Sequence, residues 1–212
     1  MAEQLSFPDF EPGGKARVPA AARRAPGAAR KAMKGLFFAL RPAPEMRATL
    51  TQLRHSLREQ HGLDGALLKP ENFHVTLHPF GQTEGDWPVE TIEAAKAAAA
   101  SVSMPPFEVA FDRAMSFNRK KATEPLVLLA VDQNLDGLLA FQHALGTAMQ
   151  RAGLGQYVER HPTPHLTLLY DRKRIEMQAI EPLGWTAHEF VLIESLIGKS
   201  THVERGCWPL RP

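Results

Sequence analysis

A pattern of histidine and threonine occurs twice in this chain. The sequence reads His-Val-Thr-Leu from His74 and His-Leu-Thr-Leu from His165, 91 positions later. Side chains alternate between the two faces of an extended strand, so His74 shares a face with Thr76, and His165 shares one with Thr167. Each stretch therefore presents an imidazole beside a hydroxyl, and the apolar residues between them can be buried.

Two imidazoles and two hydroxyls that face one cleft would suit the cleavage of a phosphodiester. The attacking oxygen must lose a proton while the leaving oxygen gains one, and imidazole can do either near neutral pH. His74 and His165 on opposite sides of phosphorus would supply both transfers. The hydroxyls of Thr76 and Thr167 can donate hydrogen bonds to the non-bridging oxygens, where charge must be stabilised.

Either stretch alone would also fit an ordinary surface or core histidine. A zinc site with His74, His78 and His165 as ligands is another interpretation, because imidazole binds zinc. No carboxylate accompanies either stretch, and Cys207 is the one cysteine, so a cysteine-based site is excluded. We therefore expect neither a metal nor a cofactor.

The surroundings of the two stretches repeat in the same register, which indicates an internal duplication. A shift of 91 residues superposes an apolar run on an apolar run, a helical pattern on a helical pattern, and Gly-Leu on Gly-Leu. The pairs are Leu36–Leu40 with Val127–Val131, Met46–Leu57 with Gly137–Ala148, and Gly62-Leu63 with Gly153-Leu154. Two lobes related by a pseudo-twofold axis would bring their His-Thr strands together.

Apolar periodicity predicts the remaining elements. Helices are expected at about 42–62, 88–102 and 134–154, and strands at about 36–40, 72–79, 107–117, 125–132, 164–170, 189–198 and 202–210. Residues 1–33 are rich in Ala, Pro, Gly and Arg without periodicity, which predicts a disordered basic tail. Residues 34–212 are expected to form a single bilobal domain.

Composition favours a globular protein of a reducing compartment. The net charge is +2, which divides into +4 for residues 1–34 and −2 for residues 35–212. Residues 35–212 therefore do not have the basic charge of a domain that wraps nucleic acid. The longest strongly apolar run, Leu126 to Val131, is too short to span a bilayer. With one cysteine and no secretory signal, we expect a cytoplasmic monomer without membrane contact.

Four stretches together resemble a known family: "LFFAL", "NFHVTLHPFG", "HPTPHLTLLYD" and "EFVLIESLIG". They are similar to the two-histidine (2H) phosphoesterases, and most of all to the bacterial RNA 2′,3′-cyclic phosphodiesterases, also called 2′–5′ RNA ligase-like proteins. The resemblance covers about residues 35–210. It implies an α+β fold with two pseudo-twofold lobes, whose two antiparallel sheets line a central cleft with helices outside.

The resemblance also implies roles for the repeated residues. His74 and His165 would be catalytic, and Thr76 and Thr167 would bind the phosphate. The implied reaction is metal-independent hydrolysis of 2′,3′-cyclic phosphates, on RNA ends or nucleotides, to 2′-phosphates. We expect His74 to protonate the leaving 3′ oxygen and His165 to activate water. The alternatives are a 2′–5′ RNA ligase or 2′–5′ phosphodiesterase, and a non-catalytic RNA-binding module.

The sequence departs from some relatives at Tyr170, where they carry Arg shortly after the second motif. Strict alternation would place Tyr170 on the face opposite His165. Phe37 and Phe38 are neighbours on a strand and must point opposite ways. One of them should border the cleft, where it could stack on a nucleobase.

Further residues are candidates for the cleft periphery. Alternation continues the face of His74 and Thr76 to His78, which would then reach the cleft rim. Lys199 lies in the "IGKST" segment and could lend positive charge to the cleft, as could His202 or Arg205.

Overall fold

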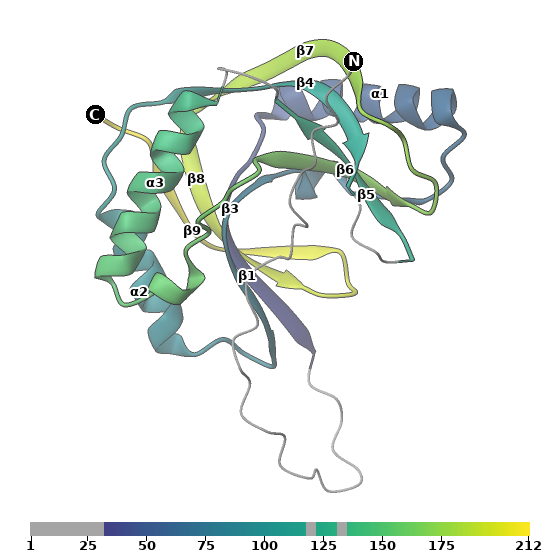
Figure 1. Ribbon diagram of the computed structural model, residues 1–212. Helices are drawn as coiled ribbons and strands as arrows, with labels where there is room; N and C mark the ends of the chain where they lie inside the picture. Colours follow the sequence, from purple (N-terminus) through teal and green to yellow (C-terminus); the bar gives the residue numbers. More distant parts are fainter. Residues whose placement is uncertain (1–31, 118–121, 131–134) are drawn as a thin grey trace, which may run out of the picture.

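The computed structural model describes residues 32–117, 122–130 and 135–212 (Figure 1). These residues confirm the α+β class, with three α-helices and a large antiparallel sheet. The helices are α1 (Pro44–His61), α2 (Val89–Ala100) and α3 (Asp136–Arg151), and short 3₁₀ turns are η1 (Pro70–Asn72) and η2 (Gly155–Tyr157). The strands are β1 (Met33–Leu40), β2 (Ala66–Leu67), β3 (Val75–Glu84), β4 (Phe107–Ser116), β5 (Glu124–Leu129), β6 (His165–Asp171), β7 (Gln178–Ala187), β8 (Glu189–Leu196) and β9 (Thr201–Pro209).

Nearly all of the predicted tail lies outside the described residues, which begin at residue 32. Strand β1 begins at Met33, three residues before the predicted apolar run. None of the described helices is both long and apolar enough to cross a membrane.

The sheet consists of two matching halves. Its strands follow the order β7-β4-β5-β6-β3-β1-β8-β9, all neighbours are antiparallel, and β2 pairs separately with β6. The halves meet where β3 and β6 pair through the single couple Val75 and Leu166. The two sheets predicted from the sequence are therefore joined into one, and this narrow joint lies between the two motif strands.

The helices cross over between the halves. Helix α1 follows β1 but contacts β6, whereas α3 follows β5 and contacts β3 and β4. Phe141 of α3 touches Phe190 of β8, with 4.9 Å between ring centroids. Helices α2 and α3 contact each other along one side of the sheet (Figure 1). One continuous buried core therefore holds both halves and fixes the motif strands relative to each other.

The ends of α1 and α3 are built alike. Gly62 and Gly153 follow the helices with φ angles of 56° and 79°, in the left-handed region that glycine adopts without steric cost. The next residues, Leu63 and Leu154, donate backbone hydrogen bonds back to the carbonyls of Arg58 and Met149 at 2.9 and 2.8 Å. Such a left-handed cap ends a helix cleanly, so the Gly-Leu repeat marks equivalent helix ends.

Each motif strand contains a β-bulge one residue after its threonine. On β3, Phe38 pairs with His78 and Ala39 pairs with Thr76, so Leu77 is an extra residue. A bulge places two residues opposite one and disturbs the alternation of faces. Leu77 and His78 are accordingly both buried.

The bulge recurs 91 positions later on β6. Leu126 pairs with Leu169 and Val127 pairs with Thr167, which leaves Leu168 as the extra residue. Leu168 and Leu169 are both buried. The two lobes thus share the His-Thr strand and also the bulge that interrupts its alternation of faces.

Strands β1 and β5 do not follow the predicted register. Phe38 and Leu126 occupy equivalent places, each opposite the residue after its bulge, and they are 88 positions apart. The prediction that Leu36 corresponds to Val127 is therefore wrong by three residues. The duplicated units differ in length between this strand and the following helix, which a single shift of the sequence cannot represent.

Candidate active site

The two motif strands bring the predicted catalytic and phosphate-binding residues onto one face. In the antiparallel register set by Val75 and Leu166, each histidine lies across from the threonine of the other strand. Val75 and Leu166 are fully buried beneath. The residues on the opposite face are all half-buried: His74, Thr76, His165 and Thr167.

Both imidazoles are held by the same backbone tether. Nδ1 of His74 lies 2.6 Å from the carbonyl of Asn72, and Nδ1 of His165 lies 2.7 Å from the carbonyl of Thr163. A carbonyl only accepts, so Nδ1 carries the hydrogen in each ring. In both histidines Nε2 is then the nitrogen that can exchange a proton: it accepts one through its lone pair, or donates one when it carries a hydrogen.

Aromatic rings border both histidines. Phe37 stacks on His74 with 4.9 Å between centroids and 26° between planes, and Phe117 meets His165 edge-on at 4.9 Å. Phe38 is fully buried in the core. Phe37 is thus the member of the phenylalanine pair that borders the site. Phe117 follows β4 and was missed, because nothing in its local sequence links it to His165.

Burial shapes the proton affinity of His74. Burial lowers its pKa to about 4, against the hydrogen bond to Asn72, and electrostatic repulsion from His202, His165 and Arg41 lowers it further. His74 is therefore neutral at pH 7 when no ligand is bound. A phosphodiester anion close to Nε2 would raise this pKa again, because an opposite charge favours the protonated ring.

The bulge corrects the predicted place of Tyr170. Leu168 and Leu169 are both buried, and the alternation resumes so that Tyr170 is half-buried on the face of His165 and Thr167. The prediction of the opposite face is wrong, because strict alternation takes no account of the extra residue Leu168.

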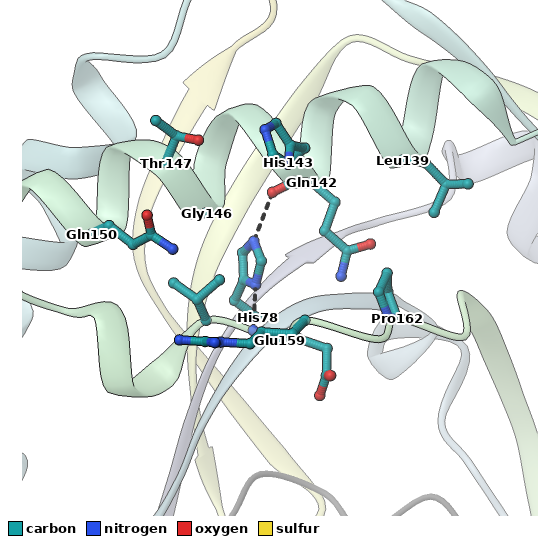
Figure 2. A pocket seen from close by; sticks show the side chains of 11 residues that line it. His78, Leu139, Gln142, His143, Gly146, Thr147, Gln150, Glu159 and Pro162 are labelled. Atoms are coloured by element: carbon teal, nitrogen blue, oxygen red, sulfur yellow. Dashed lines mark hydrogen bonds between the residues drawn. The ribbon is translucent and has the colours of Figure 1, made fainter. Parts of the chain in front are cut away.

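The corresponding bulge removes His78 from the predicted cleft rim. His78 is 1% exposed; its Nε2–H donates to the Gln142 carbonyl at 2.9 Å, and its Nδ1 accepts from the Glu159 N–H at 3.1 Å (Figure 2). Burial lowers its pKa, so the ring stays neutral. His78 therefore joins β3 to α3 and to the segment before β6.

The zinc interpretation loses its ligand set for the same reason, since His78 faces away from His74 and His165. In the described part of the chain, no group of three or more His, Cys, Asp or Glu side chains is arranged to hold a metal ion.

A half-open pocket of about 450 Å³ lies on the His78 side of β3, between α3 and residues 158–162 (Figure 2). Its lining includes His78 and Gln142 but none of the four motif residues. The side-chain amide of Gln142 donates to the Leu77 carbonyl, which is the carbonyl of the bulge residue. This pocket is thus separate from the face that carries the two motifs.

Replacing His78 by alanine should reduce stability and leave the chemistry in place. The change removes the hydrogen bond to the Gln142 carbonyl and leaves the Glu159 N–H without its imidazole acceptor, at a cost of about 1–3 kcal/mol. Urea unfolding and kcat would be measured together, with exposed His143→Ala on the same pocket as the matched control. A normal unfolding midpoint with a collapsed kcat would instead place His78 in the catalytic machinery.

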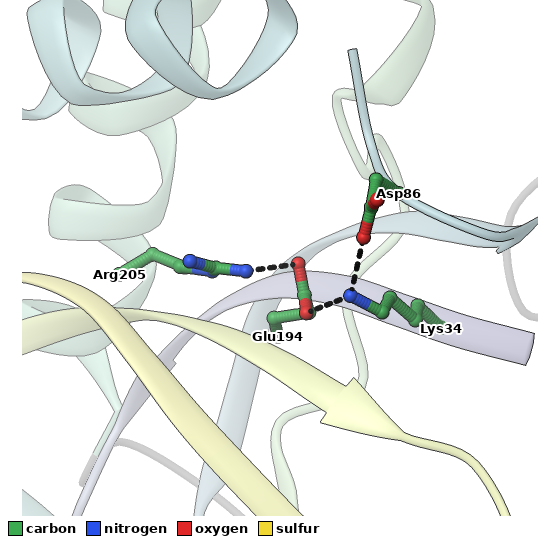
Figure 3. Close-up of polar contacts among 4 residues, drawn as sticks. All are labelled: Lys34, Asp86, Glu194 and Arg205. Atoms are coloured by element: carbon green, nitrogen blue, oxygen red, sulfur yellow. Dashed lines mark hydrogen bonds and ion pairs between the residues drawn. The ribbon is translucent and has the colours of Figure 1, made fainter. Parts of the chain in front are cut away.

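The remaining candidates for the cleft periphery, on the hairpin of β8 and β9, differ in what they contact. Lys199 is exposed in the turn between β8 and β9. Arg205 binds the buried carboxylate of Glu194 at 2.9 Å, and Lys34 binds the same carboxylate at 2.9 Å and Asp86 at 2.7 Å (Figure 3). Arg205 thus neutralises Glu194. Among the three basic candidates of this hairpin, His202 is the one in contact with His74.

Comparisons with known proteins agree with this geometry. A family model described as the 2′-5′ RNA ligase superfamily matches residues 42–196. No curated protein matches the sequence. Similar solved structures include Escherichia coli LigT in its apo form, with 23% identity, a TM-score of 0.67 and coverage of 86% of this chain and 100% of that one. A structure titled as a phosphoesterase has 22% identity, a TM-score of 0.66 and coverage of 84% and 99%.

A Thermus thermophilus protein is similar at 20% identity and a TM-score of 0.63, with 84% of this chain and 98% of that chain covered. At these identities the solved structures establish the shared fold. The family model spans most of the chain and includes both His-Thr stretches. The chain belongs to the 2′-5′ RNA ligase superfamily.

Proposed function

We propose that this protein is a metal-independent 2′,3′-cyclic phosphodiesterase that acts on RNA ends or nucleotides and releases 2′-phosphates. One observation carries the proposal. Two imidazoles with identical Nδ1 tethers, to Asn72 and to Thr163, stand on one face beside two threonine hydroxyls. Such a pair provides one proton acceptor and one proton donor for a single displacement at phosphorus.

In this mechanism Nε2 of His165 takes a proton from water as the new P–O bond forms. Nε2–H of His74 gives a proton to the 3′ oxygen as its bond to phosphorus breaks. Hydroxyls of Thr76 and Thr167 donate to the non-bridging oxygens and stabilise their charge. His74 is neutral without substrate. Binding of the anionic phosphodiester must therefore raise its pKa, so that His74 takes up a proton from solvent before it acts as the acid. Proton exchange with solvent then restores both rings.

The ligands of a structural relative support the substrate class. E. coli LigT has been solved with phosphate, with 3′-AMP and with ATP. A nucleotide or RNA end that carries a phosphate is the partner we propose for this chain. We further propose a cytoplasmic monomer, in keeping with its composition.

The family description favours a second candidate, a 2′–5′ RNA ligase or phosphodiesterase. Its chemistry is the same, with a ribose hydroxyl in place of water. An RNA-binding module without catalysis would need no pair of imidazoles with matching tautomers.

The direct test is hydrolysis of a nucleoside 2′,3′-cyclic phosphate in excess EDTA, with the product identified as the 2′- or 3′-phosphate. Turnover in EDTA with release of the 2′-phosphate is expected. No turnover on mononucleotides and on RNA with a cyclic end would reject the proposed substrate. Oligonucleotides with 2′–5′ linkages would then test the second candidate.

Tyr170→Arg should strengthen substrate binding. The position faces the same side as Thr167, and a half-buried cation beside a phosphate contributes about 0.5–1 kcal/mol, which is about two- to fivefold in KM. Tyr170→Phe is the control, because it keeps the ring without the charge. An arginine variant whose KM equals that of the phenylalanine variant at low and high salt would show that this position does not reach the phosphate.

A further inference from the structure

The hairpin of β8 and β9 is built against His74. The ring of His202, on β9, lies 5.4 Å from that of His74 and 5.6 Å from that of Phe37, both edge-on. Phe37 in turn stacks on His74 at 4.9 Å. Each of the three rings therefore touches the other two, and the imidazole of His74 is confined from two directions.

Asn72 connects this hairpin to the tether of His74. Its carbonyl accepts the Nδ1–H of His74, and its own side-chain amide donates to the carbonyl of Ser200 at 3.1 Å. Asn72 is 8% exposed. Ser200 adopts a left-handed φ of 49°, which is costly for a residue other than glycine and persists when its surroundings enforce it. The turn that carries His202 is thus fixed by the residue that orients His74.

An ion pair fastens the same hairpin to the end of β1. Arg41 follows Leu40 and binds Glu204 of β9 at 2.6 Å. The Arg41 charge also acts on both His74 and His202. At His165 the described ring contact comes from Phe117, which follows β4. The two lobes are therefore alike in their motif strands and differ in what surrounds each histidine.

We propose that His202 is a positioning residue for His74: its ring holds the His74 imidazole against Phe37 and shields it from solvent. The charged or titratable groups that face His74 are His202 from β9, His165 from β6 and Arg41 after β1, and Glu204 neutralises Arg41. Burial, and after it the charge of Arg41, lower the pKa of His202. The kinetic part of this inference rests on the proposed function, whereas the structural part does not.

The first test is the titration of His74 by NMR on protein with labelled histidine, without substrate. His202→Phe keeps an aromatic ring and removes the titratable nitrogens, and His202→Ala removes both. The pKa of His74 is expected to rise in the phenylalanine variant and to rise further in the alanine variant. Exposed His188→Ala is the matched control and should leave it unchanged. An unchanged His74 titration in both His202 variants would overturn the proposal.

The second test measures kcat and KM for a 2′,3′-cyclic phosphate. His202→Ala should lower kcat by about 10- to 100-fold with little change in KM, as expected when a reacting group is misplaced. His202→Phe should recover most of kcat and shift the pH profile in the direction of the His74 titration. A kcat equal to that of the wild type in His202→Ala would reject the positioning role. A wild type that is inactive on this substrate would reject the proposed function, while the NMR titration would still decide the role of His202.

Discussion

Replacing His74 or His165 by alanine should lower kcat on 2′,3′-cyclic phosphates by about 10²–10⁴-fold, which is the usual contribution of one acid–base group. The two imidazoles stand across the joint of β3 and β6. In the proposed mechanism they act in one displacement. The double variant is therefore expected to be little slower than the slower single variant, because residues that act as a unit are not additive. The measurement is initial-rate kinetics in EDTA.

Exposed His161 is the matched control, since it lies in the same segment as His165 without a place on the motif face. His161→Ala should keep kcat within a few-fold of the wild type. If both motif variants retained the wild-type kcat, paired acid–base catalysis would be rejected.

The pH profile of kcat/KM can assign the role of His74. This ratio reports the free enzyme, in which the pKa of His74 is about 4. If His74 is the acid, its protonated form is needed, and kcat/KM falls as pH rises through this pKa. If His74 is the base, its neutral form is needed, and kcat/KM falls as pH drops through the same pKa. The mechanism proposed above requires the first result, and a flat profile with no limb near pH 4 would contradict both roles.

Asp171→Asn should produce a large loss of stability, of about 3 kcal/mol. Asp171 is 1% exposed, and its Oδ2 accepts backbone N–H groups of Asp64 at 2.8 Å and of Gly65 at 2.6 Å. Its Oδ1 accepts the N–H of Lys173 at 2.7 Å. Hydrogen bonds to a charged group contribute about 1.5–3 kcal/mol each, and an amide would turn a donor toward at least one of these N–H groups.

The pH dependence of stability provides a second readout for Asp171. Burial alone would raise its pKa, but the backbone hydrogen bonds from Lys173, Gly65, Asp64 and Arg172 outweigh burial and hold the pKa below its ordinary value. The stabilisation is therefore present above the pKa of the unfolded chain, near 3.8, and is lost as pH falls through the lower pKa of the folded state.

Urea unfolding at pH 7 and at pH 3 would measure this effect, with exposed Asp64→Asn as the control. The gap between the wild type and Asp171→Asn should shrink at the lower pH. An equal gap at both values would show that the carboxylate charge is not what stabilises this end of β6.

The sequence predicted which side chains share the motif face, because the alternation of a strand can be followed from residue types. It also predicted helix ends at Gly62 and Gly153, because only glycine adopts that backbone freely. The hydrogen bonds that hold Nδ1 of His74 and His165 could not be predicted, since every residue has a backbone carbonyl and the sequence does not show which one accepts. Phe37 and Phe38 could not be told apart until the facing strand was known.

The strand assignments failed where the backbone departs from regular alternation. Leucine is an ordinary strand residue, so the sequence does not indicate a bulge at Leu77 or at Leu168. The faces of His78 and Tyr170, which follow these bulges, were therefore predicted wrongly. Strand β7 was missed because Pro182 and Gly184 argue against a strand. It forms an edge of the sheet, where a proline does not interrupt a ladder on both sides.

The twin bulges have a consequence for how this protein could be altered. Removing Leu77 by deletion would restore an even pleat in which His78 takes the buried place after Thr76, while Pro79 and Phe80 keep their present faces. Shortening this strand by one residue would thus leave the residues of the motif face in place and would change the packing of His78 against α3 instead. With the bulges in place, Pro79 and Tyr170 occupy equivalent positions, 91 residues apart, and both are half-buried on the face of the two motifs. Directed evolution for new nucleotide preferences should therefore find its first productive changes there.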